Sequence, residues 1–108
     1  MVTPHRFGVY WVDLDPTCGH ELRKTRPAVV VSPDELNRQL QTVIIAPLTT
    51  QSHPYPFRPP CRIAQRDSYI VLDQLRTVDR ARLGDSLGDL DTATQTTLLN
   101  ALSALFAP

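Results

Sequence analysis

The stretch "GHELRKTRPAVVVS", residues 19–32, changes character at Pro27. Six of its first eight residues are polar or charged, whereas Ala28 to Ser32 is a run of valines between two small residues. A short apolar, β-branched run that stops at a proline predicts a strand buried on both faces. The run "TVIIAPL", residues 42–48, predicts a second such strand. Because a buried strand is a rigid scaffold, the charged residues of the loop before it can be held in place for function. The alternative is that these charged residues only solvate a hairpin loop.

The rest of the chain supplies further short elements. Residues 9–14, "VYWVDL", predict a first strand, and residues 61–65 and 69–78 predict two or three more, the last of them open to a bend. Residues 33–41, "PDELNRQLQ", fit either a helical turn or a polar loop. Residues 51–60 hold four of the ten prolines, which predicts a loop rather than a central strand.

The C-terminal part predicts one amphipathic helix. Asp91 or Thr92 can cap its start, and Gly84 and Gly88 are interpreted as the turn before it. Its apolar residues recur at helical spacing and are expected to form one buried face: Leu98, Leu99, Leu102, Leu105 and Phe106. Five or six strands followed by a helix predict an α+β fold, a small, mostly antiparallel barrel or curled sheet with the helix packed against it. We expect one domain over residues 1–108.

Composition limits the function. The formal net charge of the 108 residues is zero, so no long-range basic field attracts nucleic acid and any phosphate binding must be local. Residues 1–66 nevertheless carry eight Lys and Arg against five Asp and Glu. Cys18 and Cys61 lack the spacing of metal ligands, so we expect no metal and no cofactor. The start "MVTPHRFG" has no apolar signal core and no run is long enough to span a bilayer, which predicts a cytoplasmic protein without membrane contact.

Four segments occur in the order and spacing of one known family: "GVYWVDLDPTCGHELRKTRPAVVVSP", "VIIAPLTTQ", "YPF" and "VLDQLRTVDRARLG". In these segments, from Gly8 to Gly88, the chain resembles the MazF/PemK family of toxin endoribonucleases from toxin–antitoxin modules. The resemblance implies an SH3-like barrel with a C-terminal helix, a homodimer and inhibition by a partly disordered MazE-like antitoxin. It also implies metal-independent cleavage of single-stranded RNA at short sequences, with messenger, ribosomal or transfer RNA as the target.

The resemblance assigns roles residue by residue. Arg26, Thr49 and Glu21 stand at the family's catalytic positions. Further positions are expected to contact RNA: Lys24, Thr50, Gln51, Asp73, Gln74 and Arg76. For Asp73 and Arg76, structural ion pairs are an equal alternative.

The chemistry explains why such residues are needed. RNA can be cut without metal when its 2′-OH attacks the adjacent phosphorus, expels the 5′-oxygen and leaves a 2′,3′-cyclic phosphate. The protein must accept a proton and stabilise charge on the phosphorane. A guanidinium stays protonated, so Arg26 is assigned to charge stabilisation, and Thr49 donates a hydrogen bond to the same centre. Glu21 is the expected base, and His20 is an open alternative because imidazole titrates near neutral pH.

Two other functions are compatible with the same fold. A toxin of the same fold can act by binding DNA gyrase, as the CcdB relatives do, but that activity is associated with a Trp near the C-terminus and this chain ends Leu-Phe-Ala-Pro. A non-catalytic SH3-like binding module is the third possibility. Trp11, Tyr55 and Phe57 can stack on unpaired bases, although core or hinge packing is the expected role of Trp11.

Overall fold

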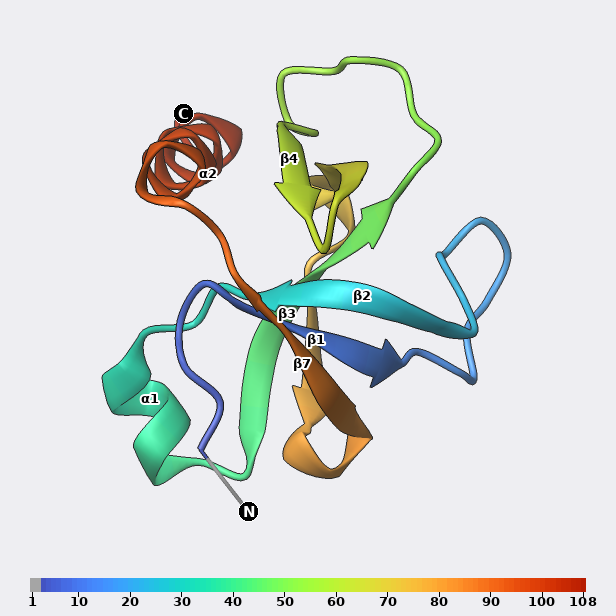
Figure 1. Ribbon diagram of the computed structural model, residues 1–108, viewed down its shortest axis with the longest axis vertical. Helices are drawn as coiled ribbons and strands as arrows, with labels where there is room; N and C mark the ends of the chain where they lie inside the picture. Colours follow the sequence, from blue (N-terminus) through green and yellow to red (C-terminus); the bar gives the residue numbers. More distant parts are fainter. Residues whose placement is uncertain (1–2) are drawn as a thin grey trace.

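A computed structural model describes residues 3–108. Seven strands, two α-helices and two short 3₁₀ turns follow one another along the chain (Figure 1). They are β1 (Gly8–Asp13), β2 (Thr25–Val30), α1 (Asp34–Gln39), β3 (Thr42–Thr49), β4 (Pro60–Ile63), β5 (Arg66–Ile70), η1 (Leu72–Gln74), β6 (Arg76–Asp79), η2 (Arg80–Arg82), β7 (Leu83–Asp89) and α2 (Thr92–Leu105).

The strands form one curled antiparallel sheet in the order β4-β5-β3-β2-β1-β7. β3 is its centre: β2 pairs along one edge, while β6 pairs with the start of β3 and β5 with its end. The short η1 turn lets the chain leave β5 and return as β6, so the predicted bent strand is two strands. The α+β prediction of a curled antiparallel sheet with a terminal helix is confirmed.

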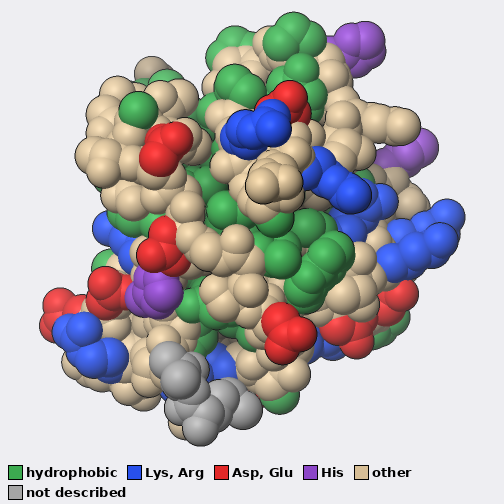
Figure 2. All heavy atoms as spheres, viewed as in Figure 1, with side chains coloured by type: hydrophobic (Ala, Val, Ile, Leu, Met, Phe, Trp, Pro, Cys, Tyr) green, Lys and Arg blue, Asp and Glu red, His purple; other side chains and the backbone are tan. Residues whose placement is uncertain are grey.

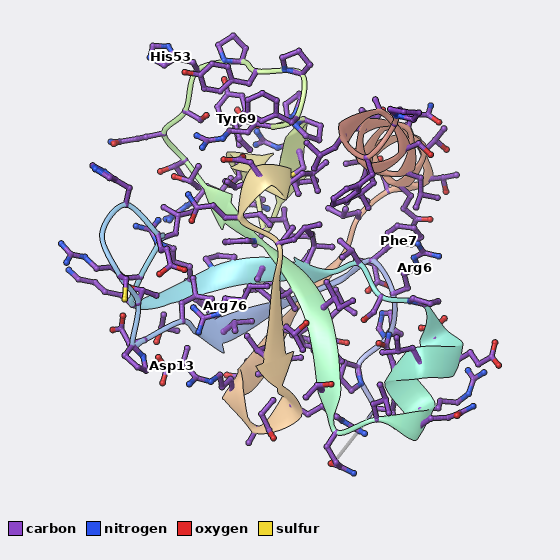
Figure 3. The ribbon with its side chains drawn as sticks, turned by 180° about the vertical axis from the view of Figure 1, so that it is seen from behind. Arg6, Phe7, Asp13, His53, Tyr69 and Arg76 are labelled. Carbon is purple, nitrogen blue, oxygen red and sulfur yellow. The ribbon has the colours of Figure 1, made fainter. Side chains whose placement is uncertain are left out.

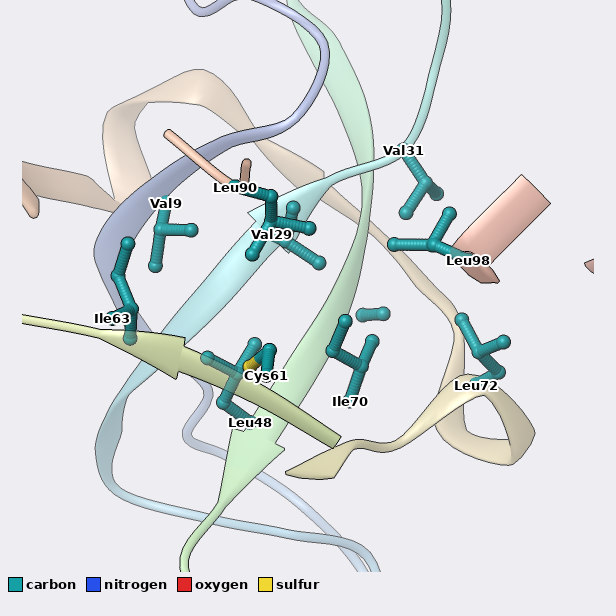
Figure 4. Close-up of a cluster of buried hydrophobic side chains, with 11 residues drawn as sticks. Val9, Val29, Val31, Leu48, Cys61, Ile63, Ile70, Leu72, Leu90 and Leu98 are labelled. Carbon is teal, nitrogen blue, oxygen red and sulfur yellow. The ribbon is translucent and has the colours of Figure 1, made fainter. Parts of the chain in front are cut away.

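The two faces of the sheet carry two hydrophobic clusters. Along β2, Val29 belongs to the first cluster, and Ala28 and Val30 belong to the second, as the period of two in a strand requires. All three are buried, so the prediction of a strand buried on both faces is confirmed. α2 closes the first cluster by inserting Leu98, which lies beside Val31 (Figure 4).

Two details of the C-terminal prediction are wrong. Gly84 and Gly88 do not form a turn but lie in β7, which pairs with β1 through an irregular register. Gly88 has a φ of 108°, a conformation that favours glycine. The apolar residues of α2 also do not form one buried face as predicted. Leu98 is fully buried, whereas Leu99 and Phe106 are 38% and 72% exposed.

The expected N-cap of α2 is confirmed. The Asp91 carboxylate accepts a hydrogen bond from the Thr94 backbone N–H at 2.7 Å, and this bond lowers the pKa of Asp91. The undecided stretch after Pro33 is a helix, α1. Within residues 3–108, no helix combines the length and the apolar character that crossing a membrane requires.

Candidate active site

The registers of the central strands place Arg26 and Thr49 side by side. Ala28 of β2 pairs with Pro47 of β3, and continuing this antiparallel register by two residues sets Arg26 opposite Thr49. By strand alternation, Arg26 lies on the same face as Ala28 and Thr49 on the same face as Pro47. Arg26 and Thr49 therefore come from neighbouring strand ends, and their joint role in catalysis stays a prediction.

Both residues line one pocket of about 250 Å³, which we call the strand-end pocket. Its lining residues are Trp11, Arg23, Lys24, Thr25, Arg26, Pro27, Leu48, Thr49, Thr50, Arg66 and Ser68. Four of them are Lys or Arg and none is Asp or Glu, so the pocket favours anions such as phosphate. Figure 2 shows several Lys and Arg side chains on the side of the molecule where the loop between β1 and β2 lies in Figure 1.

The Arg26 side chain is oriented by the chain itself. Its Nε donates a hydrogen bond to the Arg23 carbonyl at 3.0 Å, and the side chain is half-buried. No hydrogen bond or ion pair of its two terminal nitrogens exists among residues 3–108. These nitrogens are the ones that can grip phosphate oxygens.

The Thr49 hydroxyl is held by the residue two positions on. It donates to the Gln51 carbonyl at 3.2 Å and accepts from the Gln51 backbone N–H at 3.3 Å. Both bonds are long, so a phosphate oxygen can compete for the hydroxyl proton. Gln51 itself does not line the strand-end pocket, whereas Thr50 and Lys24 do.

Two residues of this pocket differ from expectation. Trp11 is 38% exposed and lines the pocket, so the core part of its predicted core or hinge packing is wrong, and the hinge part stays a prediction. Arg66 was not predicted as a site residue at all. The signal for it is the alternation in β5, where Ser68 and Ile70 are buried and Arg66 continues the same face to the rim.

A second pocket of about 210 Å³ contains the other predicted residues; we call it the loop pocket. It is lined by Leu14, Glu21, Leu22, Pro47, Asp73, Gln74, Leu75 and Arg76. Glu21 therefore shares a pocket with Asp73, Gln74 and Arg76, and not with Arg26 and Thr49. His20 is exposed and lines neither pocket.

The polar groups of the loop pocket are occupied by neighbouring chain segments. Gln74 accepts a hydrogen bond from the Leu22 backbone N–H at 2.8 Å, and Arg76 donates to the Leu14 carbonyl at 2.6 Å. In Figure 3, Arg76 lies beside the β1–β2 hairpin. Glu21 accepts from the Cys18 backbone N–H at 2.7 Å, which closes a turn in the same loop.

Asp73 forms a two-bond ion pair with Arg58, at 2.9 and 2.8 Å. Its side-chain hydrogen bonds with Arg58 lower the pKa of Asp73 and raise that of Arg58. The alternative of a structural ion pair thus holds for Asp73. Arg76 makes a structural hydrogen bond to a carbonyl and no ion pair with any described residue.

The described residues contain no group of three or more His, Cys, Asp or Glu side chains that can hold a metal ion. The two thiols differ: Cys18 is exposed, whereas Cys61 is buried in the first cluster. Burial raises the pKa of the Cys61 thiol to about 11.

The sequence model of one family matches residues 5–106, and its members are described as PemK-like, MazF-like toxins of type II toxin–antitoxin systems. The chain belongs to this PemK/MazF family. The endoribonuclease toxin MazF of Escherichia coli (strain K12) is 39% identical over 75 residues, which are 69% of this chain and 68% of that protein. Endoribonuclease EndoA of Bacillus subtilis (strain 168) is 37% identical over 92 residues, which are 80% of this chain and 79% of that protein.

A solved structure similar to this PemK/MazF chain is an endoribonuclease in complex with its cognate antitoxin from Mycobacterial species. The TM-score is 0.82 at 29% sequence identity, and 97% of each chain is covered. The curled sheet with its terminal helix is therefore shared along almost the whole chain. The predicted family membership is confirmed, and these similarities favour the nuclease over the gyrase-binding and non-catalytic alternatives.

Proposed function

We propose that the chain is the toxin of a type II toxin–antitoxin module and that it inhibits translation and growth by cutting single-stranded RNA at short sequences without a metal ion. One observation carries the proposal. Arg26 and Thr49 meet at adjacent strand ends in a pocket lined by four cationic residues and no carboxylate. The similarity to MazF and EndoA, both named endoribonucleases, supports it.

The reaction needs only the substrate's own nucleophile. The ribose 2′-OH gives its proton to a base and attacks the adjacent phosphorus, the bond to the 5′-oxygen breaks, and that oxygen takes up a proton from solvent water as it leaves. Arg26 binds the non-bridging oxygens, where negative charge grows in the phosphorane. Thr49 donates a hydrogen bond to the same centre once its hydroxyl exchanges the Gln51 carbonyl for a phosphate oxygen.

The proton acceptor is a separate question. Glu21 lies in the loop pocket, where one carboxylate oxygen holds the Cys18 N–H and the other remains available. We keep Glu21 as the proposed base, with His20 of the same loop as the alternative. Lys24, Thr50 and Trp11 contact the RNA beside the reacting phosphate.

The proposal includes partners. A MazE-like antitoxin binds and inhibits the toxin; the similar endoribonuclease from Mycobacterial species is in complex with its cognate antitoxin, which supports such a partner. Two copies of the chain form a homodimer, in which the exposed Leu99 and Phe106 of α2 are candidates for the contact. The cytoplasm is the compartment where the RNA substrate and the antitoxin would both be met.

The test uses two strands of one sequence. Purified protein is incubated in EDTA with single-stranded RNA and with DNA of the same sequence. We expect only the RNA to be cut, because DNA lacks the 2′-OH. Cleavage of the DNA, or a requirement for added Mg²⁺, contradicts the mechanism.

A further inference from the structure

Arg66 is a cation of the strand-end pocket with no role in the reaction described above. It begins β5, directly after Ala64 and Gln65, whose φ values of 50° and 63° make a tight left-handed turn. This turn joins β4 to β5 and sets Ile63 opposite Arg66 and Arg62 opposite Asp67. The rigid hairpin therefore decides which way each of its two arginines faces.

The two arginines face opposite sides. Ile63, the partner of Arg66, is buried in the first cluster, so Arg66 lies on the core side of the hairpin at its rim. Arg62 lies on the outer side, where it donates to Asp67 at 2.8 Å. The one acidic residue next to Arg66 in sequence is thus turned away and already paired. Among residues 3–108, Arg66 makes no ion pair.

Strand alternation also separates Arg66 from the reacting centre. Leu48 pairs with Ile70, and Ser68 and Arg66 continue the face of Ile70 toward the strand end. Thr49 pairs with Tyr69 and, with Arg26, lies on the other face. Residues from both faces of the sheet therefore line the strand-end pocket. Arg26 and Thr49 come from one face, and Arg66 and Ser68 come from the other.

We propose that Arg66 binds the phosphate that flanks the scissile one, and so positions the RNA strand across the ends of β2, β3 and β5. This inference rests on the proposed function for its substrate. Its physical basis is that Arg66 has no ion pair among residues 3–108, lies next to a two-residue turn, and lines a pocket without carboxylates from the sheet face opposite to that of Arg26. Arg66 is a positioning residue: it holds the strand and does not touch the reacting phosphorus.

The experiment compares Arg66→Ala, Arg66→Lys and the matched control Arg62→Ala, which removes an arginine from the outer side of the same hairpin. Binding is measured with the DNA strand, which carries the phosphates but cannot be cut by the 2′-OH route, and is followed by fluorescence of Trp11, the single tryptophan. Cleavage of the RNA strand gives kcat and KM.

We expect Arg66→Ala to weaken binding of the DNA strand about tenfold and to reduce the slope of log K against log salt by ~0.7, the value for one contact to a single strand. KM rises by the same factor and kcat stays within about threefold. Arg66→Lys keeps the slope because it keeps the charge, and Arg62→Ala behaves as wild type.

Two results overturn the inference. In the first, Arg66→Ala has the same Kd and the same salt slope as Arg62→Ala. In the second, Arg66→Ala lowers kcat ~10²-fold, which would place Arg66 on the scissile phosphate. Should the wild type cut no RNA, the proposed function fails, while the binding arm still decides whether Arg66 holds a phosphate.

Discussion

The strand-end pocket and the loop pocket are similar in size and hold a similar number of charged residues, yet they use them differently. In the strand-end pocket, Arg26 and Arg66 have guanidinium groups without an acidic partner among the described residues. In the loop pocket, Asp73 is paired with Arg58, and Arg76 is bound to the Leu14 carbonyl. The charged side chains of the first pocket are available to a ligand. Those of the second pocket are bound to other parts of the protein.

The difference assigns complementary tasks to the pockets. The bonds of Gln74 to Leu22 and of Arg76 to Leu14 fasten the loop between β1 and β2 to η1 and β6. The ion pair of Asp73 with Arg58 fastens the loop after β3 in the same way. These two loops flank the strand ends that present Arg26 and Thr49. The loop pocket thus holds in place the two loops on either side of the strand-end pocket, which is the proposed RNA site.

The largest effect is expected in the strand-end pocket. Arg26→Ala should lower kcat about 10²-fold or more, because the guanidinium that stabilises the negative charge of the phosphorane is removed. The thermal unfolding midpoint should stay close to that of the wild type, since the side chain makes one hydrogen bond to a loop carbonyl. Single-turnover cleavage of RNA measures the first quantity and calorimetry the second. Near-normal turnover would remove Arg26 from the site.

A smaller effect of another kind is expected in the loop pocket. Arg76→Met should lower the free energy of unfolding by about 1 to 2 kcal/mol, because a charged hydrogen bond to a carbonyl is lost, and should change kcat by less than about tenfold. Arg38→Met, on the exposed side of α1, is the control and should stay within about 0.5 kcal/mol of the wild type. A stable Arg76→Met that loses turnover as Arg26→Ala does would make Arg76 a direct RNA ligand and end the distinction between the pockets.

The smallest effect is a dependence on pH. The pKa of Asp73 is lowered below its ordinary value of 3.8 by Arg58, so folding favours the charged form. The stabilisation is therefore complete above the unfolded pKa and is lost as the pH falls through the folded pKa. The gap in urea midpoint between wild type and Asp73→Asn should be constant from pH 7 to 5 and shrink below about pH 4. Asp85→Asn, an exposed control, should show no such gap; a gap that widens in acid would reverse the assigned direction.

Much of the scaffold follows from local sequence. β2 and β3 are apolar runs that can only be buried, and Asp91 has the side chain that caps a helix. β7 has no apolar pattern that predicts a strand, because its residues are mostly exposed. Its pairing with β1 decides its conformation. Glycines that suggest a turn are tolerated there because the strand needs little burial.

The site was less accessible from the sequence than the scaffold. Arg26 and Thr49 could be named from a resemblance, but their convergence depends on the register between β2 and β3. The exposure of Trp11 depends on the register between β1 and β2, and the direction of Arg66 depends on the register of the β4–β5 hairpin. The separation of Glu21 from Arg26 depends on the fold of a loop that Cys18 and Gln74 hold in place. The alternation in β5 marks the face of Arg66, whereas the register between β2 and β3 and the fold of the β1–β2 loop leave no periodic signal in one chain.

The measurement that bears most directly on the central claim is the identity of the ends produced from RNA in EDTA, read by mass spectrometry. Attack by the ribose within a site formed by Arg26 and Thr49 predicts a 2′,3′-cyclic phosphate on one fragment and a 5′-hydroxyl on the other. Fragments that carry a 3′-hydroxyl and a 5′-phosphate would mean that water, and not the substrate's own sugar, is the nucleophile.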